Sequence, residues 1–250
     1  MLRRSTKNYI RNKAWIFLKA NWTLRSGITL KVTNDSDWFV FNEIFTNKEY
    51  DPAYWLFLTS ASKRPLILDL GANVGYFTLK IANELILNGF SQFDIISLEA
   101  SPLNYHILQE RVSQPLLENK VKCFLGLAGY KSGVNTVVHS KQHYGHSSVS
   151  NKSKNVKVVE VKYMNIVTLI QDTKRRVDLL KCDIEGSEEI FIDNYTDLLN
   201  RTDHAVFEFH ARECNIENCR KLLLQAGLSS KGIIKEDPSY KTIVEIFARR

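Results

Sequence analysis

The chain has 250 residues, of which 44% are hydrophobic and 24% are charged, an ordinary composition for a globular protein with a full core. No apolar run approaches the length of a membrane span, and the four cysteines form neither a CxxC pair nor a cluster with histidine, which argues against a zinc site or a disulfide framework. Together with an N-terminus that lacks the apolar core of a signal peptide, these features predict a cytoplasmic protein.

The positive charge is concentrated at the N-terminus. Residues 1–34 hold eight basic residues and no acid, whereas the other 216 residues hold 26 basic and 27 acidic residues. Residues 1–25 have the pattern of a basic amphipathic helix, which can lie on an anionic membrane surface or pack on the core with its basic face in solvent. We favour packing on the core and keep a weak membrane-surface contact as the alternative. The nearly neutral remainder argues against a nucleic-acid partner.

The first quarter of the chain is predicted to cover the sheet of the main domain and not to fold as a separate domain. Ile28–Val32 and Trp38–Phe41 have the composition of short strands, and Tyr50–Leu58 is predicted to be a helix. No boundary signal separates these elements from the rest of the chain. We therefore predict that residues 1–64 are a dependent cover and that residues 65–250 form the main domain.

A strand, a glycine turn and a helix come directly after the cover. Leu66–Leu70 is a short apolar run typical of a buried parallel strand, and Tyr76–Leu87 has helical spacing. The turn between them contains Gly71, Asn73 and Gly75. Glycines let a backbone approach a ligand closely, and Asp69 lies near the carboxyl end of the strand, where open α/β sheets bind ligands. An ordinary βα turn is the alternative interpretation.

Two further strands end in carboxylates. Ile95–Leu98 is followed by Glu99, which can accept hydrogen bonds from both hydroxyls of a ribose or satisfy the start of the next helix. Asp178–Cys182 is followed by Asp183, which the parallel arrangement brings to the same sheet edge as the glycine turn. A carboxylate at that position can orient a ligand amine or an acceptor hydroxyl.

The last part of the chain predicts one more parallel strand and a closing hairpin. Val206–Phe209 is apolar except for Glu208, which shares strand parity with His210. Two polar side chains on an otherwise apolar strand need partners or a cleft. Leu228–Ile234 and Thr242–Phe247 are predicted to form an antiparallel pair at the edge of the sheet.

Three of these segments carry a resemblance to a known family. They read Asp-Leu-Gly-Ala-Asn-Val-Gly-Tyr-Phe-Thr from Asp69, Leu-Glu-Ala-Ser-Pro from Leu98, and Leu-Lys-Cys-Asp-Ile-Glu-Gly-Ser-Glu from Leu180. At these spacings they resemble the FkbM family of S-adenosylmethionine-dependent methyltransferases, over about residues 65–228. The resemblance implies an α/β, Rossmann-like class I methyltransferase fold, with a mostly parallel seven-stranded sheet and helices on both faces. It also implies methyl transfer to a hydroxyl oxygen.

The resemblance further implies roles for individual residues. Glu99 would take the ribose of S-adenosylmethionine, and Asp183 would lie near the methionine amine or the acceptor. The remaining residues expected at the cofactor are Asp69, Gly71, Asn73, Gly75 and Leu127. One stretch departs from the family pattern, because Asn165–Leu169 lacks the acid of the usual Thr-Leu-Asp-Asp-Leu. The acceptor would be a small molecule or a glycan, with its hydroxyl on a sugar, a lipid or a natural product.

Methyl transfer to a hydroxyl requires a group that accepts the proton of the hydroxyl. His210 is the first candidate base, since an unperturbed histidine titrates near neutral pH, and Asp183 is the second. A structural His210 bonded to Glu208 competes with this role. Asp183, Glu208 and His210 could also hold a divalent cation that acidifies the acceptor, although the sequence does not predict a metal site.

Three alternative functions remain open. A nicotinamide-dependent dehydrogenase would share the first turn, but Gly-Ala-Asn-Val-Gly lacks the three-glycine fingerprint. An RNA 2′-O-methyltransferase would use the same chemistry, with the basic arm as its contribution to phosphate binding. A non-catalytic scaffold is the third, and the intact glycines and acids of the three motifs argue against it. The sequence predicts no oligomeric state.

Overall fold

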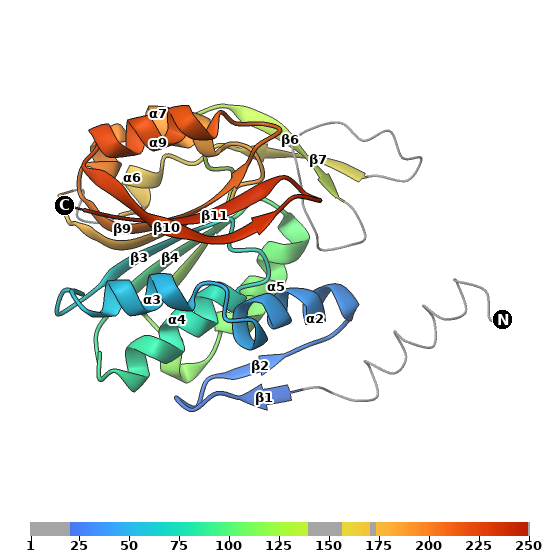
Figure 1. Cartoon of the computed structure of the whole chain (residues 1–250). Coiled ribbons are helices and arrows are strands. Elements are labelled where there is room, and N and C mark those ends of the chain that lie inside the picture. The colour runs from blue at the N-terminus through green and yellow to red at the C-terminus, as the bar shows by residue number, and fades with distance from the viewer. Residues whose placement is uncertain (1–20, 140–156, 171–173, 250) are drawn as a thin grey trace.

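The centre of the computed structural model, which describes residues 21–139, 157–170 and 174–249, is a twisted seven-stranded sheet (Figure 1). Its strands, in spatial order, are β10 (Leu228–Asp237), β11 (Thr242–Arg249), β9 (Thr202–His210), β8 (Val177–Cys182), β3 (Leu66–Leu70), β4 (Asp94–Glu99) and β5 (Val121–Leu125). Strand β11 is antiparallel to both of its neighbours, and the pairs from β9 to β5 are parallel. The predicted mostly parallel sheet with a closing hairpin is confirmed.

Helices cover both faces of this sheet (Figure 1). One face carries α6 (Ile166–Leu169), α7 (Glu188–Asn194), α8 (Thr196–Leu199) and α9 (Ile216–Gln225). The other face carries α3 (Asp51–Leu58), α4 (Tyr76–Leu87) and α5 (Pro102–Val112). Each face has its own cluster of buried apolar side chains, and nearly every residue of the three central strands β3, β4 and β8 is buried.

The register of the central strands brings polar side chains together at one edge. Asp69 of β3 lies opposite Lys181 of β8 and opposite Ser97 of β4. The carboxyl ends of β3, β4 and β8 therefore meet, with Glu99 and Asp183 at or just beyond them. This is the edge where open α/β sheets bind ligands.

Residues before β3 pack on the face that carries α4. Strands β1 (Asn21–Thr23) and β2 (Thr29–Lys31) form a small antiparallel hairpin, followed by α2 (Asp35–Phe41) and the π-helix η1 (Asn42–Thr46). Buried side chains from this segment and from α3 join the core cluster of α4. Residues 1–20, which include most of the predicted basic helix, lie outside the described residues, so the choice between core packing and membrane contact stays a prediction.

The strand predicted over Trp38–Phe41 is wrong, since these residues belong to helix α2. The side chain of Asn34 caps the helix by accepting a hydrogen bond from the Asp37 backbone N–H at 2.9 Å. The Asp37 carboxylate forms a buried ion pair with Arg111 of α5 at 2.7 Å. A cap at the start and a buried partner on another helix outweigh the β preference of aromatic residues.

Two smaller elements complete the described structure. Strands β6 (Val134–His139) and β7 (Lys157–Lys162) pair antiparallel as a hairpin that projects beside the sheet (Figure 1). The 3₁₀-helix η2 (Pro115–Leu117) connects α5 to β5. Within the described part of the chain, no helix combines the length and the apolar character that crossing a membrane requires.

Candidate active site

The glycine turn after β3 requires left-handed backbone at three positions. Gly71, Asn73 and Gly75 have φ angles of 77°, 50° and 92°, a region that glycine occupies freely and asparagine tolerates. A Cβ on Gly71 would lie 1.7 Å from the carbonyl oxygen of Asp183, and one on Gly75 would lie 2.7 Å from the Leu108 side chain. The glycines are therefore required by close packing within the protein, in addition to any ligand.

Glu99 is fixed by backbone donors at the end of β4. Its carboxylate accepts the N–H of Asn73 at 2.8 Å and the N–H of Ser101 at 2.7 Å. Burial raises the pKa of Glu99 to about 7, although both backbone hydrogen bonds lower it. A carboxylate has about four acceptor positions, so two backbone donors leave capacity for the paired hydroxyls of a ribose.

Lys181 connects the glycine turn to the carboxylates of β3 and β8. Its Nζ donates to the carbonyl oxygen of Gly71 at 2.6 Å and lies 3.2 Å from Asp183 Oδ2 and 3.6 Å from Asp69 Oδ1. Burial alone would lower the pKa of Lys181, but Asp183 and Asp69 outweigh it and raise the pKa. Sequence reasoning missed this residue, although a lone cation between Leu180 and Cys182 of a buried strand was a signal for it.

Asp69 lies beneath the turn in a closed polar network. Its side chain is 0% exposed and accepts a hydrogen bond from Thr78 Oγ1 at 2.7 Å. Burial raises the pKa of Asp69, while Lys181 and Thr78 act in the opposite direction. Asp69 is therefore a buried counter-charge for Lys181. Whether Asp69 also contacts a cofactor stays a prediction.

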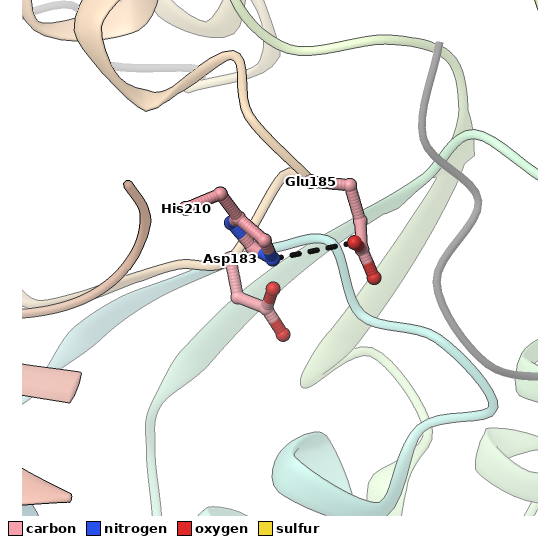
Figure 2. A group of neighbouring side chains, drawn as sticks. All are labelled: Asp183, Glu185 and His210. Carbon is pink, nitrogen blue, oxygen red and sulfur yellow. Dashed lines mark ion pairs between the residues drawn. The ribbon is translucent and has the colours of Figure 1, made fainter. Parts of the chain in front are cut away.

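His210, at the end of β9, lies between two carboxylates of the segment that comes after β8. Its Nε2 is 3.3 Å from Glu185 Oε2, and its Nδ1 is 3.1 Å from Glu188 Oε1. Figure 2 shows that Asp183 points toward the same space as Glu185 and His210. Glu188 is fully buried, and its Oε1 also accepts the backbone N–H groups of Ile184 and Gly186.

These surroundings correct the expected titration of His210. Burial alone would lower its pKa, but the hydrogen bonds to Glu185 and Glu188 raise it to about 12. The two carboxylates therefore favour the protonated form of the imidazole. His210 is therefore not an unperturbed histidine, and its role as a base stays a prediction.

Glu208 is not a hydrogen-bond partner of His210, which contradicts the alternative of a structural His210 bonded to Glu208. Its Oε2 accepts a hydrogen bond from the Tyr50 hydroxyl at 3.4 Å, beneath the N-terminal cover. Burial raises the pKa of Glu208 to about 8, and Asp183 adds to the rise. The two residues separate because His210 is the last residue of β9 and turns toward α7, whereas Glu208 faces the cover.

A cavity joins these features at the sheet edge. It runs from Glu99 past the glycine turn to the carboxylates beyond β8, and its lining includes Gly71, Asn73, Glu99, Leu127, Asp183 and Glu185. Five of the predicted cofactor-binding residues thus meet at one cavity. Gly75, Asp69 and His210 are not part of its lining, and the cofactor and catalytic assignments of all these residues stay predictions.

The sheet order, the terminal hairpin and the cavity at the strand ends define the class I methyltransferase fold. The Methyltransferase FkbM domain matches residues 69–229, and the chain belongs to this family. The resemblance inferred from the three motifs is therefore confirmed. S-adenosylmethionine is the cofactor expected of such a protein.

Individual proteins are similar to this chain. Methyltransferase sdnD of Sordaria araneosa is 26% identical over 180 residues, which make up 60% of this chain and 65% of that protein. The crystal structure of Methyltransferase FkbM from Methylobacillus flagellatus KT has a TM-score of 0.52 at 16% identity and covers 75% of this chain and 44% of that one. The METTL16 MTase domain has a TM-score of 0.50 at 12% identity, covering 96% and 90% of the two chains. These two structures support the fold alone.

The residues present suit the expected cofactor. The buried carboxylate of Glu99 faces the cavity with acceptor capacity left over, which matches a ribose with two neighbouring hydroxyls. Gly71 and Asn73 of the turn line the same cavity. At the far end, Asp183 and Glu185 supply negative charge that suits an ammonium group or a hydroxyl.

Proposed function

We propose that this chain transfers a methyl group from S-adenosylmethionine to a hydroxyl oxygen of a small molecule or a glycan. One observation carries the proposal. The same cavity is lined at one end by Glu99, the carboxylate suited to a ribose, and at the other end by the carboxylates of Asp183 and Glu185. A cofactor at the first end would direct its reactive part toward the second. The charged edge offers hydrogen-bond acceptors for a hydroxyl, which supports oxygen as the target.

In this mechanism the chain binds and orients. When bound, S-adenosylmethionine supplies a methyl group on a positively charged sulfur, which is the electrophile. Glu99 would hold the ribose, and the turn at Gly71 and Asn73 would contact the ligand along the cavity wall. Asp183, held by Lys181, orients the amine of the ligand or the hydroxyl of the acceptor. Correct orientation of two reactants supplies about 7–11 kcal/mol of the barrier.

The N-terminal cover supplies polar groups close to Asp183, and we place the acceptor on that side of the carboxylate. Tyr50 and Glu208 lie there, together with Lys235, which pairs with Glu49 at 2.7 Å and Glu43 at 3.1 Å. Hydroxyl, carboxylate and ammonium groups are the usual partners of a polyhydroxylated molecule, which favours a sugar over an apolar acceptor. The cover lies outside the residues matched by the family, so it is where acceptor specificity would differ between members.

The test combines binding with product analysis. Calorimetry should show saturable binding of S-adenosylmethionine and of its demethylated product. Glycan and lipid extracts incubated with the protein and isotopically labelled cofactor should then yield labelled methyl ethers in mass spectrometry. Label found only on nitrogen would refute O-methylation. A protein that does not bind the cofactor at millimolar concentration would refute the proposal as a whole.

A further inference from the structure

Three potential metal ligands converge at the charged end of the cavity. Asp183, Glu185 and His210 each offer one donor atom, and these atoms lie within 4.8 Å of one another. Figure 2 shows the carboxylates and the imidazole turned toward a common space. The 3.3 Å between His210 Nε2 and Glu185 Oε2 is close to the separation of about 3 Å expected for neighbouring ligands around one cation.

A buried carboxylate behind the cluster fixes the histidine. Glu188 is fully buried, and the backbone N–H groups of Ile184 and Gly186 hold its Oε1, which lies 3.1 Å from His210 Nδ1. With a proton on Nδ1, the lone pair of Nε2 points to the space shared with Asp183 and Glu185. In metal-binding histidines, the N–H of the second ring nitrogen characteristically donates a hydrogen bond to a carboxylate in this way. This hydrogen bond fixes the orientation of the ring.

We propose that Asp183, Glu185 and His210 bind a divalent cation of the Mn²⁺ type, with open coordination positions that receive the acceptor hydroxyl. The two carboxylates also line the cavity, so the open side of the site faces the space left for ligands. Carboxylates are preferred ligands of Mg²⁺ and Mn²⁺, and imidazole is a preferred ligand of Zn²⁺. A site with two carboxylates and one imidazole therefore suits a cation of intermediate preference, such as Mn²⁺. This inference rests on the proposed O-methylation and names how the acceptor is activated.

The charges around the site agree with a dication. Asp183, Glu185 and Glu188 are three acidic side chains around the site, and Lys181 contacts Asp183 through Oδ2 at 3.2 Å.

At the open coordination position the acceptor hydroxyl would react in two steps. The O–H bond of the acceptor breaks and its proton leaves to water. The oxygen then uses its electron pair to form the new C–O bond as the C–S bond breaks, and that bond's electrons stay on sulfur. The cation lowers the pKa of the hydroxyl in the first step. The reaction then requires no neutral histidine as a base.

Direct metal binding tests the site without reference to turnover. Protein freed of metal with a chelator is titrated with Mn²⁺, and the signal of free Mn²⁺ is followed by electron paramagnetic resonance. One Mn²⁺ should bind per chain, with Mg²⁺ and Zn²⁺ competing. Folded protein that binds none of these ions at millimolar concentration would overturn the proposal and leave His210 and Glu185 as an ion pair.

Four substitutions locate the ion. Glu185→Gln and His210→Gln each remove a ligand and should abolish tight binding, while Glu188→Gln should weaken it by about 10–100-fold through loss of orientation. Glu213→Gln changes an exposed neighbour that packs on Gly186 and is the matched control. Glu185, 34% exposed, is the ligand whose Gln variant best preserves the fold. If all four variants bound Mn²⁺ as tightly as the wild type, the ion would lie elsewhere in the protein. That result would overturn the assignment.

Failure of this inference and failure of the proposed function are distinguishable. Methyl transfer to a hydroxyl that continues in chelator, with no bound metal, overturns the cation alone. Stoichiometric Mn²⁺ binding lost in Glu185→Gln, with methyl transfer to nitrogen only, supports the metal site and overturns O-methylation.

Discussion

The two ends of the cavity are built in different ways. At the ribose end, Glu99 is held by the backbone N–H groups of Asn73 and Ser101. At the charged end, Asp183 is held by the side chain of Lys181, and Glu185 by that of His210. The ribose end depends on the conformation of one turn. The charged end depends on charged side chains of β8, of β9 and of the loop after β8.

This difference determines how each end should respond to mutation. A backbone-held end fails when the turn cannot adopt its φ angles, whatever the side chain's charge. A side-chain-held end fails when one charge is removed and its buried partner is left alone. Substitutions paired with matched controls can separate these two kinds of failure.

The largest effect is expected at Gly71. Gly71→Ala should abolish cofactor binding and lower the melting temperature strongly, because the new Cβ would lie 1.7 Å from the Asp183 carbonyl oxygen. Gly89→Ala is the matched control, since Gly89 has φ of 83° but open space around its Cβ. The control should lose about 1–2 kcal/mol of stability from backbone strain alone. Calorimetry and thermal melts measure both, and equal losses in the two variants would contradict the packing argument.

The next effect is expected at Lys181. Lys181→Met leaves the fully buried Asp69 without its cation, and breaking such a pair costs about 3–5 kcal/mol of unfolding free energy. Lys235→Met is the matched control, because Lys235 also pairs with two carboxylates but is 31% exposed against 5% for Lys181. Denaturant unfolding should show the smaller loss in the control. Comparable losses would show that burial does not decide the value of these pairs.

The same contrast explains what the sequence predicted. The ribose end depends on local order along the chain: a buried strand, a turn of Gly and Asn, and an acid after the next strand. Those signals predicted the sheet, the turn and the position of Glu99. The grouping of Gly71, Asn73, Glu99 and Asp183 at one cavity was predicted by the rule that parallel strands end at the same edge.

The charged end was predicted only in part. Strand parity placed Glu208 beside His210, but the last residue of β9 turns toward α7, and its partners are Glu185 and Glu188. Glu185 adopts a left-handed backbone with φ of 54°, which directs its side chain in a way no periodicity reveals. Tertiary geometry, and not local pattern, decides which of several acids meets a given histidine.

A moderate effect is expected at Glu99. Glu99→Ala should weaken cofactor binding by about 1.5–3 kcal/mol, because hydrogen bonds to a charged group are lost. Asp94→Asn is the matched control at the opposite end of β4, where Asp94 pairs with Arg64 and Arg175. Calorimetry should find its cofactor affinity unchanged. An unchanged dissociation constant in a folded Glu99→Ala variant would assign Glu99 to holding the turn alone.

The smallest effect is the pH dependence of cofactor affinity. Burial raises the pKa of Glu99 to about 7 in the ligand-free protein. Ribose hydroxyls donate to the ionised carboxylate, so binding favours the deprotonated form, and affinity is complete above this pKa and lost as pH falls through it. Between about pH 8 and about pH 6 the ionised fraction, and with it the affinity, should fall roughly tenfold.

The cofactor amine also titrates, so the dependence must be compared with that of Glu99→Gln, which keeps the side chain's shape but has no ionisable group. Calorimetry across this range should show a steeper loss of affinity in the wild type than in the variant. Parallel curves would mean that Glu99 does not change its protonation when the ligand binds. The ribose end would then be held by backbone geometry alone, without a contribution from charge, and the contrast with the charged end would be complete.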